Sequence, residues 1–247
     1  MVYIQKKKDI LWGGATASSQ YEGGYDLDGK GLDTQDCRPY LKRTSDATTA
    51  TRLLTQEVID EAKKCQGVGN YPFRKGSDGY HHIDEDIALL KELGIDIYRF
   101  SISWARLYPQ GDELEPNKEG IAFYDHIFKE VHKAGMKIFL TMNHYAVPLY
   151  LVENYGGWTN RKLVTFYERF AKTVFEHWGQ YIDYFLPFNE INAGYFSPYN
   201  GVGLVKEKDQ PYNQSLVFQS LHHQFIASAK TIKIARELSP KSQSGCM

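Results

Sequence analysis

Apolar residues recur every three or four positions in several segments of the chain, the spacing that forms one face of an amphipathic helix. These segments cover residues 55–64, 82–94, 117–135, 159–179 and 212–238. We expect the second to begin near Asp84 or Asp86, which are typical helix-start residues. Gly94, Gly135 and Gly179 are the expected ends of the second, third and fourth. The pattern therefore predicts several substantial helices.

Short apolar runs separate these helices and predict strands. They lie near residues 10–14, 96–103, 137–143 and 182–188, and the run 243–247 could begin a further strand. Helices that alternate with short strands indicate parallel strands joined by crossovers, as in doubly wound sheets and (β/α)8 barrels. A closed barrel needs eight strands, and this chain supplies four or five. The predicted fold class is α/β, a TIM (β/α)8 barrel family with only the first four to five β/α units.

The stretch from Tyr25 to Tyr80 breaks this alternation. It is rich in Gly, Asp and Thr, and its helical segment is short. We interpret it as a long loop after the first strand, with residues 41–73 as an insertion. The 247 residues then form a single domain, 1–247, which is the N-terminal portion of a barrel.

Composition narrows the functional class. The net charge of -1 at pH 7 argues against a nucleic-acid partner, since neutralising phosphates needs an excess of Lys and Arg. No long apolar run follows the lysines near the start, and no segment is long enough to span a membrane, so we expect neither a signal peptide nor a membrane partner. Cys37, Cys65 and Cys246 are scattered and show no disulfide or metal spacing. We therefore expect a cytoplasmic protein with no cofactor and no metal.

Polar side chains fall at the carboxyl ends of the predicted strands. Gln20 follows the first strand, Arg99 lies in the second, and His144 closes the third. Asn189 and Glu190 close the fourth, at the end of an apolar run. Each residue alone is weak evidence. Their recurrence at equivalent points of successive units predicts that they converge on one site, because the carboxyl ends of parallel strands share one edge.

A glycosidic bond suits such a site. Its hydrolysis needs a carboxylic acid to protonate the leaving oxygen and a second carboxylate on the other face of the sugar. Amides and imidazoles can hold the hydroxyl groups, and aromatic rings can cover the apolar sugar face. The 18 Tyr, 13 Phe and 4 Trp fit this interpretation, although most of them are expected in the core.

The chain resembles the N-terminal half of family 1 glycoside hydrolases, the β-glucosidase and 6-phospho-β-glucosidase family. The matching segments are LWGGATASSQYEGG, DGKG, YHHIDEDIALLKELGIDIYRFSISWARLYP, GMKIFLTMNHYAVPLYL, YGGWTN and FNEIN. They follow in order over nearly the whole chain, apart from roughly residues 41–73. The resemblance implies a (β/α)8 barrel and a retaining mechanism.

The resemblance also implies roles for individual residues. Glu190 is the expected general acid/base, and Asn189 is expected to contact the sugar 2-hydroxyl. Gln20 and His144 are expected to bind hydroxyls of the glycone, and Arg99 to hold the nucleophile from the floor of the site.

Tyr145 is a further candidate substrate-binding residue, with a packing role equally open. The other single residues have structural explanations too: Gln20 could cap a turn and Arg99 could be an ion-pair partner. We interpret Trp158 and the pairs His81–His82 and His222–His223 as packing or solvated residues.

Three departures from the family pattern change the expectation. Ala146 stands where the family usually has a carboxylate. The pair Ile191–Asn192 follows Glu190, as in the 6-phospho-β-glucosidase branch, which favours a 6-phosphoglucoside over a plain β-glucoside. The nucleophile glutamate, expected on a seventh strand, has no counterpart in the chain. We therefore expect this polypeptide alone to be inactive.

Other functions stay open at this point. A half-barrel could be a non-catalytic carbohydrate-binding or assembly module, and a barrel glycosidase of another specificity is a third alternative. Unpaired strand edges in an open half-barrel also predict self-association.

Overall fold

The computed structural model describes residues 10–42 and 54–247. One parallel sheet organises this part of the chain, and its strands lie in chain order. The strands are β1 (Gly13–Ala15), β2 (Ile97–Ser101), β3 (Lys137–Asn143), β4 (Ile182–Phe188) and β5 (Gln243–Ser244). Each lies within or close to a predicted strand, and β1 begins later than expected. The order confirms parallel strands joined by crossovers.

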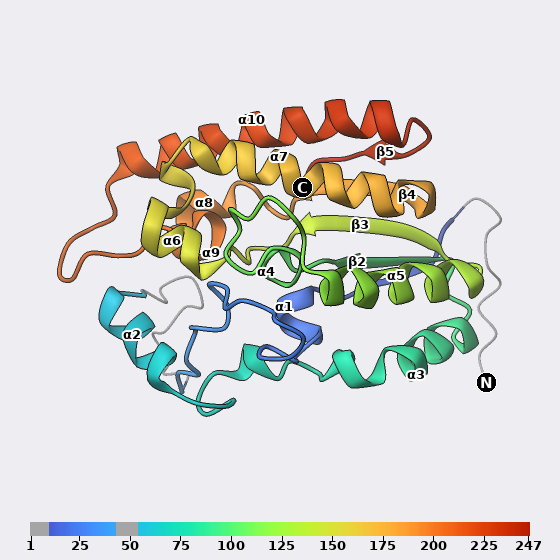
Figure 1. The fold of residues 1–247 in the computed structure, drawn as a ribbon, viewed down its shortest axis with the longest axis horizontal. Coiled ribbons are helices and arrows are strands. Elements are labelled where there is room, and N and C mark those ends of the chain that lie inside the picture. The colour runs from blue at the N-terminus through green and yellow to red at the C-terminus, as the bar shows by residue number, and fades with distance from the viewer. Residues whose placement is uncertain (1–9, 43–53) are drawn as a thin grey trace.

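Long helices connect successive strands and run alongside the sheet (Figure 1). They are α3 (Gly79–Glu92), α5 (Lys118–Lys133), α7 (Lys162–Trp178) and α10 (Gln214–Leu238). Among the helices of the described residues, none combines the length and apolar character that a membrane crossing requires.

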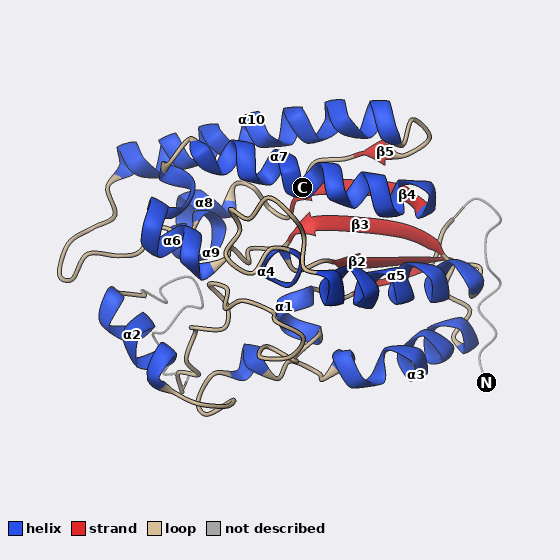
Figure 2. Cartoon of the chain, viewed as in Figure 1, coloured by secondary structure: helices blue, strands red, loops and turns tan. Residues whose placement is uncertain are grey.

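Short helices gather mainly at the carboxyl ends of the strands, on the left of Figure 2. They are α1 (Ser18–Tyr21), α2 (Gln56–Lys64), α4 (Trp104–Leu107), α6 (Leu149–Tyr155), α8 (Ala193–Phe196) and α9 (Pro198–Val202). The structure also contains the 3-10 turns η2 (Pro72–Arg74), η3 (Gly157–Thr159) and η4 (Gly179–Tyr181), of which η4 directly precedes β4 and lies at its amino end. This end of the sheet is therefore built from irregular segments, which can carry functional side chains.

The two faces of the sheet differ in burial. On one face, Phe100 packs on Phe128 of α5 and Phe185 packs on Phe175 of α7, with ring centroids 5.2 and 5.0 Å apart. On the other face, three residues that are neighbours in register are only partly buried: Arg99, Phe139 and Tyr184. Parallel sheets are normally covered on both faces. The half-exposed face is the one that would line the inside of a barrel.

An aromatic cluster forms the core between the sheet and α7. Trp104 lies 5.6 Å from Phe170, and Tyr167 lies 5.6 Å from Trp158 and 4.6 Å from Phe188, measured between ring centroids. Trp158 is fully buried, so its side chain packs in the core. Much of the high aromatic content is therefore structural.

A buried ion pair joins the first and second strand-to-helix loops. Glu22 accepts from Arg106 Nε at 3.1 Å and from the Tyr124 hydroxyl at 2.6 Å. The guanidinium also donates to the carbonyls of Gly23 and Gly24 at 3.1 and 3.2 Å. Arg106 is fully buried and Glu22 is 4% exposed, so the ion pair lies inside the protein. Nη1 of Arg106 is buried there without a hydrogen-bond partner among the described residues.

The first strand-to-helix loop contains a buried polar turn. Lys30 Nζ lies 3.3 Å from Asp33 and 2.6 Å from Asp36. Burial and the charge of Asp33 raise the pKa of Asp36 to about 6, although Lys30 opposes the shift. The Thr34 amide donates to the Val147 carbonyl at 2.9 Å, which ties this turn to the loop after β3.

Arg74 fixes the described part of the predicted insertion. Its guanidinium donates to the carbonyls of Ala62 and Gly67 at 2.7 Å and of Cys65 at 2.8 Å, at and just after the end of α2. It also donates to the carbonyl of Asp36 at 3.0 Å. These bonds tie the end of α2 to η2 and to Asp36. Residues 43–53 of the predicted insertion lie outside the described residues.

The start of α3 differs from the prediction. The helix begins at Gly79, before both expected residues. Asp86 instead accepts from the Tyr21 hydroxyl at 2.5 Å, and Asp84 lies 2.5 Å from the His126 ring. These contacts between elements occupy both carboxylates, so neither acts as a cap. Glycine is needed at the true start because a Cβ at position 79 would lie 2.2 Å from the Tyr21 ring.

Candidate functional site

Two neighbouring strands end in polar residues that lie together. β4 is followed by Asn189 and Glu190, and β3 is followed by His144 and Tyr145. The backbone N–H of Asn189 donates to the carbonyl of Asn143, the last residue of β3, at 2.9 Å. This backbone bond holds the two loops side by side at the carboxyl edge of the sheet.

Both loops turn sharply at a residue with left-handed backbone geometry. The φ angle is 67° at Tyr145 and 39° at Glu190. Such angles are uncommon for residues other than glycine and recur at functional sites. The Tyr145 carbonyl accepts from the Thr34 hydroxyl at 3.2 Å, so the first loop supports the turn.

The Tyr145 hydroxyl donates to Oε2 of Glu190. Tyr145 is half-buried and Glu190 is exposed. Burial, followed by the hydrogen bond to Glu190, raises the pKa of the Tyr145 phenol well above its usual range. The His144 ring packs edge-on against the phenol ring, with centroids 4.9 Å apart and planes at 87°. The carboxylate therefore has one fixed protein donor and remains open to solvent.

Arg99 reaches the same cluster from β2. Its Nη2 donates to Oδ1 of Asn189 at 2.5 Å, and its Nε donates to the Thr141 hydroxyl at 2.8 Å. Its Nη1 points to the Met247 sulfur at 3.3 Å, a weak acceptor. Because Oδ1 of Asn189 accepts from Arg99, the amide nitrogen is turned toward other partners.

His144 is neutral near pH 7. Burial, together with the positive charge of Arg99, lowers its pKa to about 4, and the charge of Glu190 opposes the shift. A neutral imidazole has one donor and one acceptor nitrogen, which suits the hydrogen bonds of a sugar hydroxyl.

Gln20 is not joined to this cluster. It lies in α1, directly after β1, and its side chain is exposed with no hydrogen bond to another described residue. It sits at the same edge of the sheet as the other candidates. Thr34 and Thr141 form hydrogen bonds to Tyr145 and Arg99, respectively. The sequence pattern did not predict them as site residues, because neither stands at a predicted strand end.

Two other carboxylates, Glu153 in α6 and Asp183 in β4, are the nearest alternatives to a second catalytic carboxylate. Both are bound to residues outside the cluster. Glu153 pairs with Lys63 at 2.7 Å. Asp183 is at the amino end of β4, where it lies 3.4 Å from Lys137 and accepts from the Ile138 amide at 2.9 Å. Neither belongs to the Glu190 cluster.

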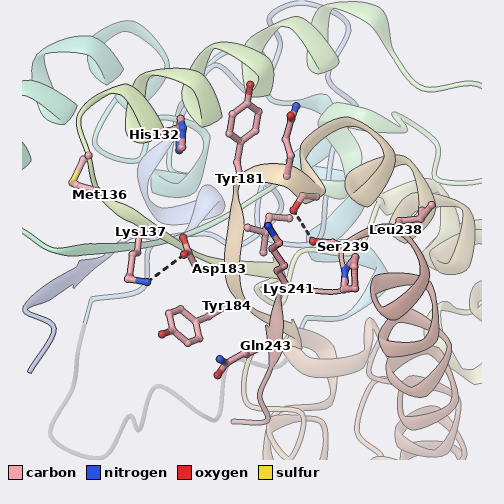
Figure 3. Close-up of a pocket in the computed structure, with 15 residues that line it drawn as sticks. His132, Met136, Lys137, Tyr181, Asp183, Tyr184, Leu238, Ser239, Lys241 and Gln243 are labelled. Atoms are coloured by element: carbon pink, nitrogen blue, oxygen red, sulfur yellow. Dashed lines mark hydrogen bonds and ion pairs between the residues drawn. The ribbon is translucent and has the colours of Figure 1, made fainter. Parts of the chain in front are cut away.

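A cavity of about 660 Å3 lies at the amino ends of β3, β4 and β5 (Figure 3). Lys137, Asp183, Tyr184 and Gln243 are among the residues that line it. Chemistry in β/α folds occurs at the carboxyl ends of strands, and the amino ends serve stability. The candidate site is therefore the cluster around Glu190 at the opposite end.

One histidine of each pair has an ordinary hydrogen-bond partner. His81 Nδ1 lies 2.6 Å from Oδ1 of Asp78. His223 is buried, with its ring nitrogens 2.8 Å from the Trp158 carbonyl and from Gln219 Nε2. Within residues 10–42 and 54–247, no group of three or more His, Cys, Asp or Glu could hold a metal ion.

Comparisons with known proteins identify the family. The family model Glycosyl hydrolase family 1 matches residues 3–247. The 6-phospho-beta-glucosidase AscB of Escherichia coli (strain K12) is 42% identical over 240 residues, which cover 97% of this chain and 49% of AscB. The aryl-phospho-beta-D-glucosidase BglH of Bacillus subtilis (strain 168) is also 42% identical and is covered over 47% of its length.

Solved structures give the same answer for the fold. The beta-glucosidase from Thermotoga maritima in complex with glucoimidazole superposes with a TM-score of 0.77 at 25% identity, covering 97% of this chain and 48% of that one. The AHE enzyme from Alicyclobacillus herbarius gives 0.76 at 29% identity, covering all of this chain and half of that one.

These neighbours are TIM barrels, which confirms the predicted partial (β/α)8 barrel. The chain spans about half the length of the curated relatives that it matches. The match to the family model includes the Glu190 cluster and every residue that the structure describes. The chain belongs to glycosyl hydrolase family 1.

Proposed function

We propose that this chain supplies the acid/base half of a retaining β-glycosidase that acts on 6-phospho-β-glucosides. The observation that supports this most directly is the placement of Glu190. Its carboxylate is exposed at the carboxyl end of β4, beside Asn189 and next to the end of β3. That is the position from which a side chain can reach a ligand at the mouth of a barrel.

In the proposed reaction, the Glu190 carboxyl protonates the oxygen that leaves the sugar. A second carboxylate attacks the anomeric carbon and forms a covalent glycosyl-enzyme. Glu190, now ionised, takes a proton from the water that releases the sugar. Asn189 holds the 2-hydroxyl, and neutral His144 together with Gln20 holds other glycone hydroxyls.

The nucleophile must come from outside the described cluster. A retaining pair stands about 5–5.5 Å apart, and Glu153 and Asp183 have partners elsewhere. Arg99 is the group that we expect to hold the nucleophile. One of its nitrogens now faces the Met247 thioether, a weak acceptor that a carboxylate would replace favourably. We therefore propose that the 247-residue chain is inactive alone.

The names of the relatives favour a phosphorylated glycone. AscB is a 6-phospho-beta-glucosidase and BglH an aryl-phospho-beta-D-glucosidase. The Ile191–Asn192 pair after Glu190 supports the same branch. The three cysteines are free, which fits the reducing cytoplasm that we propose for the protein.

A turnover assay tests this function. The 247-residue chain is compared with a fused chain, in which the C-terminal half of AscB follows this sequence. We expect the fused chain to hydrolyse p-nitrophenyl 6-phospho-β-glucoside with a higher kcat/KM than the unphosphorylated glucoside, and the chain alone to stay at background. Strong activity of the chain alone, or none in a folded fused chain, would contradict the proposal.

The role of Glu190 needs a separate test. In the fused chain, Glu190→Gln should lower kcat by about 10²–10⁴-fold, the usual contribution of acid/base catalysis. Glu190→Ala should regain turnover with added azide, because a small anion can attack the glycosyl-enzyme without a base. Glu153→Gln is the matched control, and it should keep wild-type activity.

We also propose that the chain self-associates through its open edges. β1 and β5 are the outer strands of the sheet. Large apolar side chains are exposed on α8 and α10, beyond β4: Tyr195, Phe196, Phe218 and Phe225. Phe225 is 56% exposed although it lies in a helix with a buried face. Light scattering should give a mass well above 28.4 kDa, and a clean monomer would contradict this proposal.

A further inference from the structure

The phenol of Tyr145 and the carboxylate of Glu190 belong to different strand-to-helix loops, yet they meet in one hydrogen bond. Each is reached through a left-handed turn, with φ of 67° and 39°. Backbone geometry of this kind persists only where the surroundings enforce it. The contact is therefore a product of both loops.

We infer that Tyr145 is a positioning residue for the proposed acid/base: its hydroxyl donates to Oε2 of Glu190 and fixes the carboxyl in the orientation that leaves Oε1 facing the glycosidic oxygen. This inference rests on the proposed function. It replaces the expectation that Tyr145 binds substrate directly.

An exposed glutamate needs such a partner. Its side chain has several rotatable bonds and, without a donor, samples many orientations. Catalysis by proton transfer depends on placing the acid within hydrogen-bond reach of the leaving oxygen. A single donor on Oε2 restricts the carboxyl and leaves the other oxygen available.

The donor is itself anchored from several sides. The Thr34 hydroxyl donates to the Tyr145 carbonyl at 3.2 Å and accepts from the Val147 amide at 3.2 Å. The His144 ring packs edge-on against the phenol. The phenol therefore reaches Glu190 from a loop that the first strand-to-helix segment holds in place.

The charge of the donor also matters. Arg99 is the nearby cation, and its guanidinium contacts Asn189 Oδ1 at 2.5 Å, while the Asn189 side chain is hydrogen-bonded to the phenol. Glu190 thus receives a neutral phenol as its donor. A guanidinium on Glu190 would hold the carboxyl ionised, whereas an acid/base must gain and lose a proton in each cycle.

Nuclear magnetic resonance of the 247-residue chain tests the contact without any turnover. The tyrosines are labelled at Cζ, and Tyr145→Phe assigns the resonance. We expect the Tyr145 resonance to move as the pH falls from 8 to 4 and to lose most of that movement in Glu190→Gln. Any remainder reports His144, which titrates near 4. Equal movement in both proteins would overturn the inference.

Tyr155 is the matched internal control. Its hydroxyl donates to the Asp112 carboxylate at 2.8 Å, in another part of the fold. The Tyr155 resonance should move alike in the wild-type chain and in Glu190→Gln. A difference there would mean that the substitution alters the whole fold.

Kinetics of the fused chain separate positioning from substrate binding. Tyr145→Phe should lower kcat about 10- to 100-fold with little change in KM, the effect of a misplaced catalytic group. Tyr155→Phe should leave both constants unchanged. An effect of Tyr145→Phe on KM alone would overturn the inference.

The two proposals fail in different ways. If Glu190→Gln keeps wild-type turnover, the proposed function fails. If Glu190→Gln loses turnover while Tyr145→Phe keeps the wild-type kcat, only the positioning role fails.

Discussion

The molecule contains two clusters of the same residue types, and they are built differently. Around Glu22, a buried carboxylate accepts from Arg106 and from the Tyr124 hydroxyl. Around Glu190, an exposed carboxylate accepts from the Tyr145 hydroxyl. Both lie after a strand of the same sheet. Composition alone therefore does not separate a structural cluster from the candidate catalytic one.

The difference lies in where the arginine points. Arg106 makes its ion pair directly with Glu22, inside the protein. Arg99 contacts the Asn189 amide and leaves Glu190 with a neutral donor. The first arrangement stabilises the fold, and the second suits the acid/base role that we propose for Glu190.

The largest expected effect is the loss of the buried cation. Arg106→Leu leaves the carboxylate of Glu22 buried without its charge partner, and we expect unfolding free energy to fall by about 3–5 kcal/mol. Urea denaturation measures this. Arg99→Leu, in the half-exposed cluster, should lose less than about 2 kcal/mol. Equal losses in the two variants would remove the distinction between the clusters.

Removal of the Tyr124 hydroxyl should also destabilise the protein more than removal of the Tyr145 hydroxyl. Tyr124→Phe removes a donor from a buried carboxylate and should cost about 1–3 kcal/mol. Tyr145→Phe removes a donor from an exposed carboxylate, which water can replace, so the change should stay within about 0.5 kcal/mol. Thermal or urea unfolding of both variants provides the comparison.

A pH titration of stability isolates His144. Its folded pKa of about 4 lies below its usual 6.5, so the unfolded chain binds the proton more readily between these values. This contribution is fully present above pH 6.5 and is lost as the pH falls toward 4. Full burial would give at most about 3 kcal/mol, and partial exposure reduces it to about 1–2 kcal/mol. The difference in unfolding free energy between the wild-type chain and His144→Gln should fall in this way as the pH is lowered. Curves that stay parallel for the two proteins would contradict the prediction.

The left-handed turn at Glu190 gives the smallest expected effect. At a φ of 39°, glycine avoids the clash of a Cβ, so Glu190→Gly should be about 1 kcal/mol more stable than Glu190→Ala. At Glu22, glycine should give no such advantage. Urea midpoints of the four variants test whether the site stores backbone strain.

Much of the fold follows from periodicity in the sequence. The apolar runs near 137–143 and 182–188 become β3 and β4, because short β-branched and aromatic runs between helices have few alternatives. The start of α3 was wrong because Asp84 and Asp86 bond to other elements. The partners, Tyr21 and His126, are dozens of residues away in the sequence, so no local pattern predicts these contacts.

The sequence predicted only part of the candidate site. Position at strand ends predicted that Arg99 and Asn189 would meet, and the structure joins them by a hydrogen bond. The bond from Tyr145 to Glu190 and its support by Thr34 depend on how loops cross. Gln20 shares their edge of the sheet but has no bond to them.

The strands of the sheet stand in the order in which the chain is made. Each new strand can add to the edge that the preceding unit has just formed, with no need for a later segment to slip between two earlier ones. During translation, the growing polypeptide could therefore assemble this sheet unit by unit as it leaves the ribosome. Neighbour-only pairing also means that each new strand closes only the connection to the strand before it, which limits the entropy lost at each step.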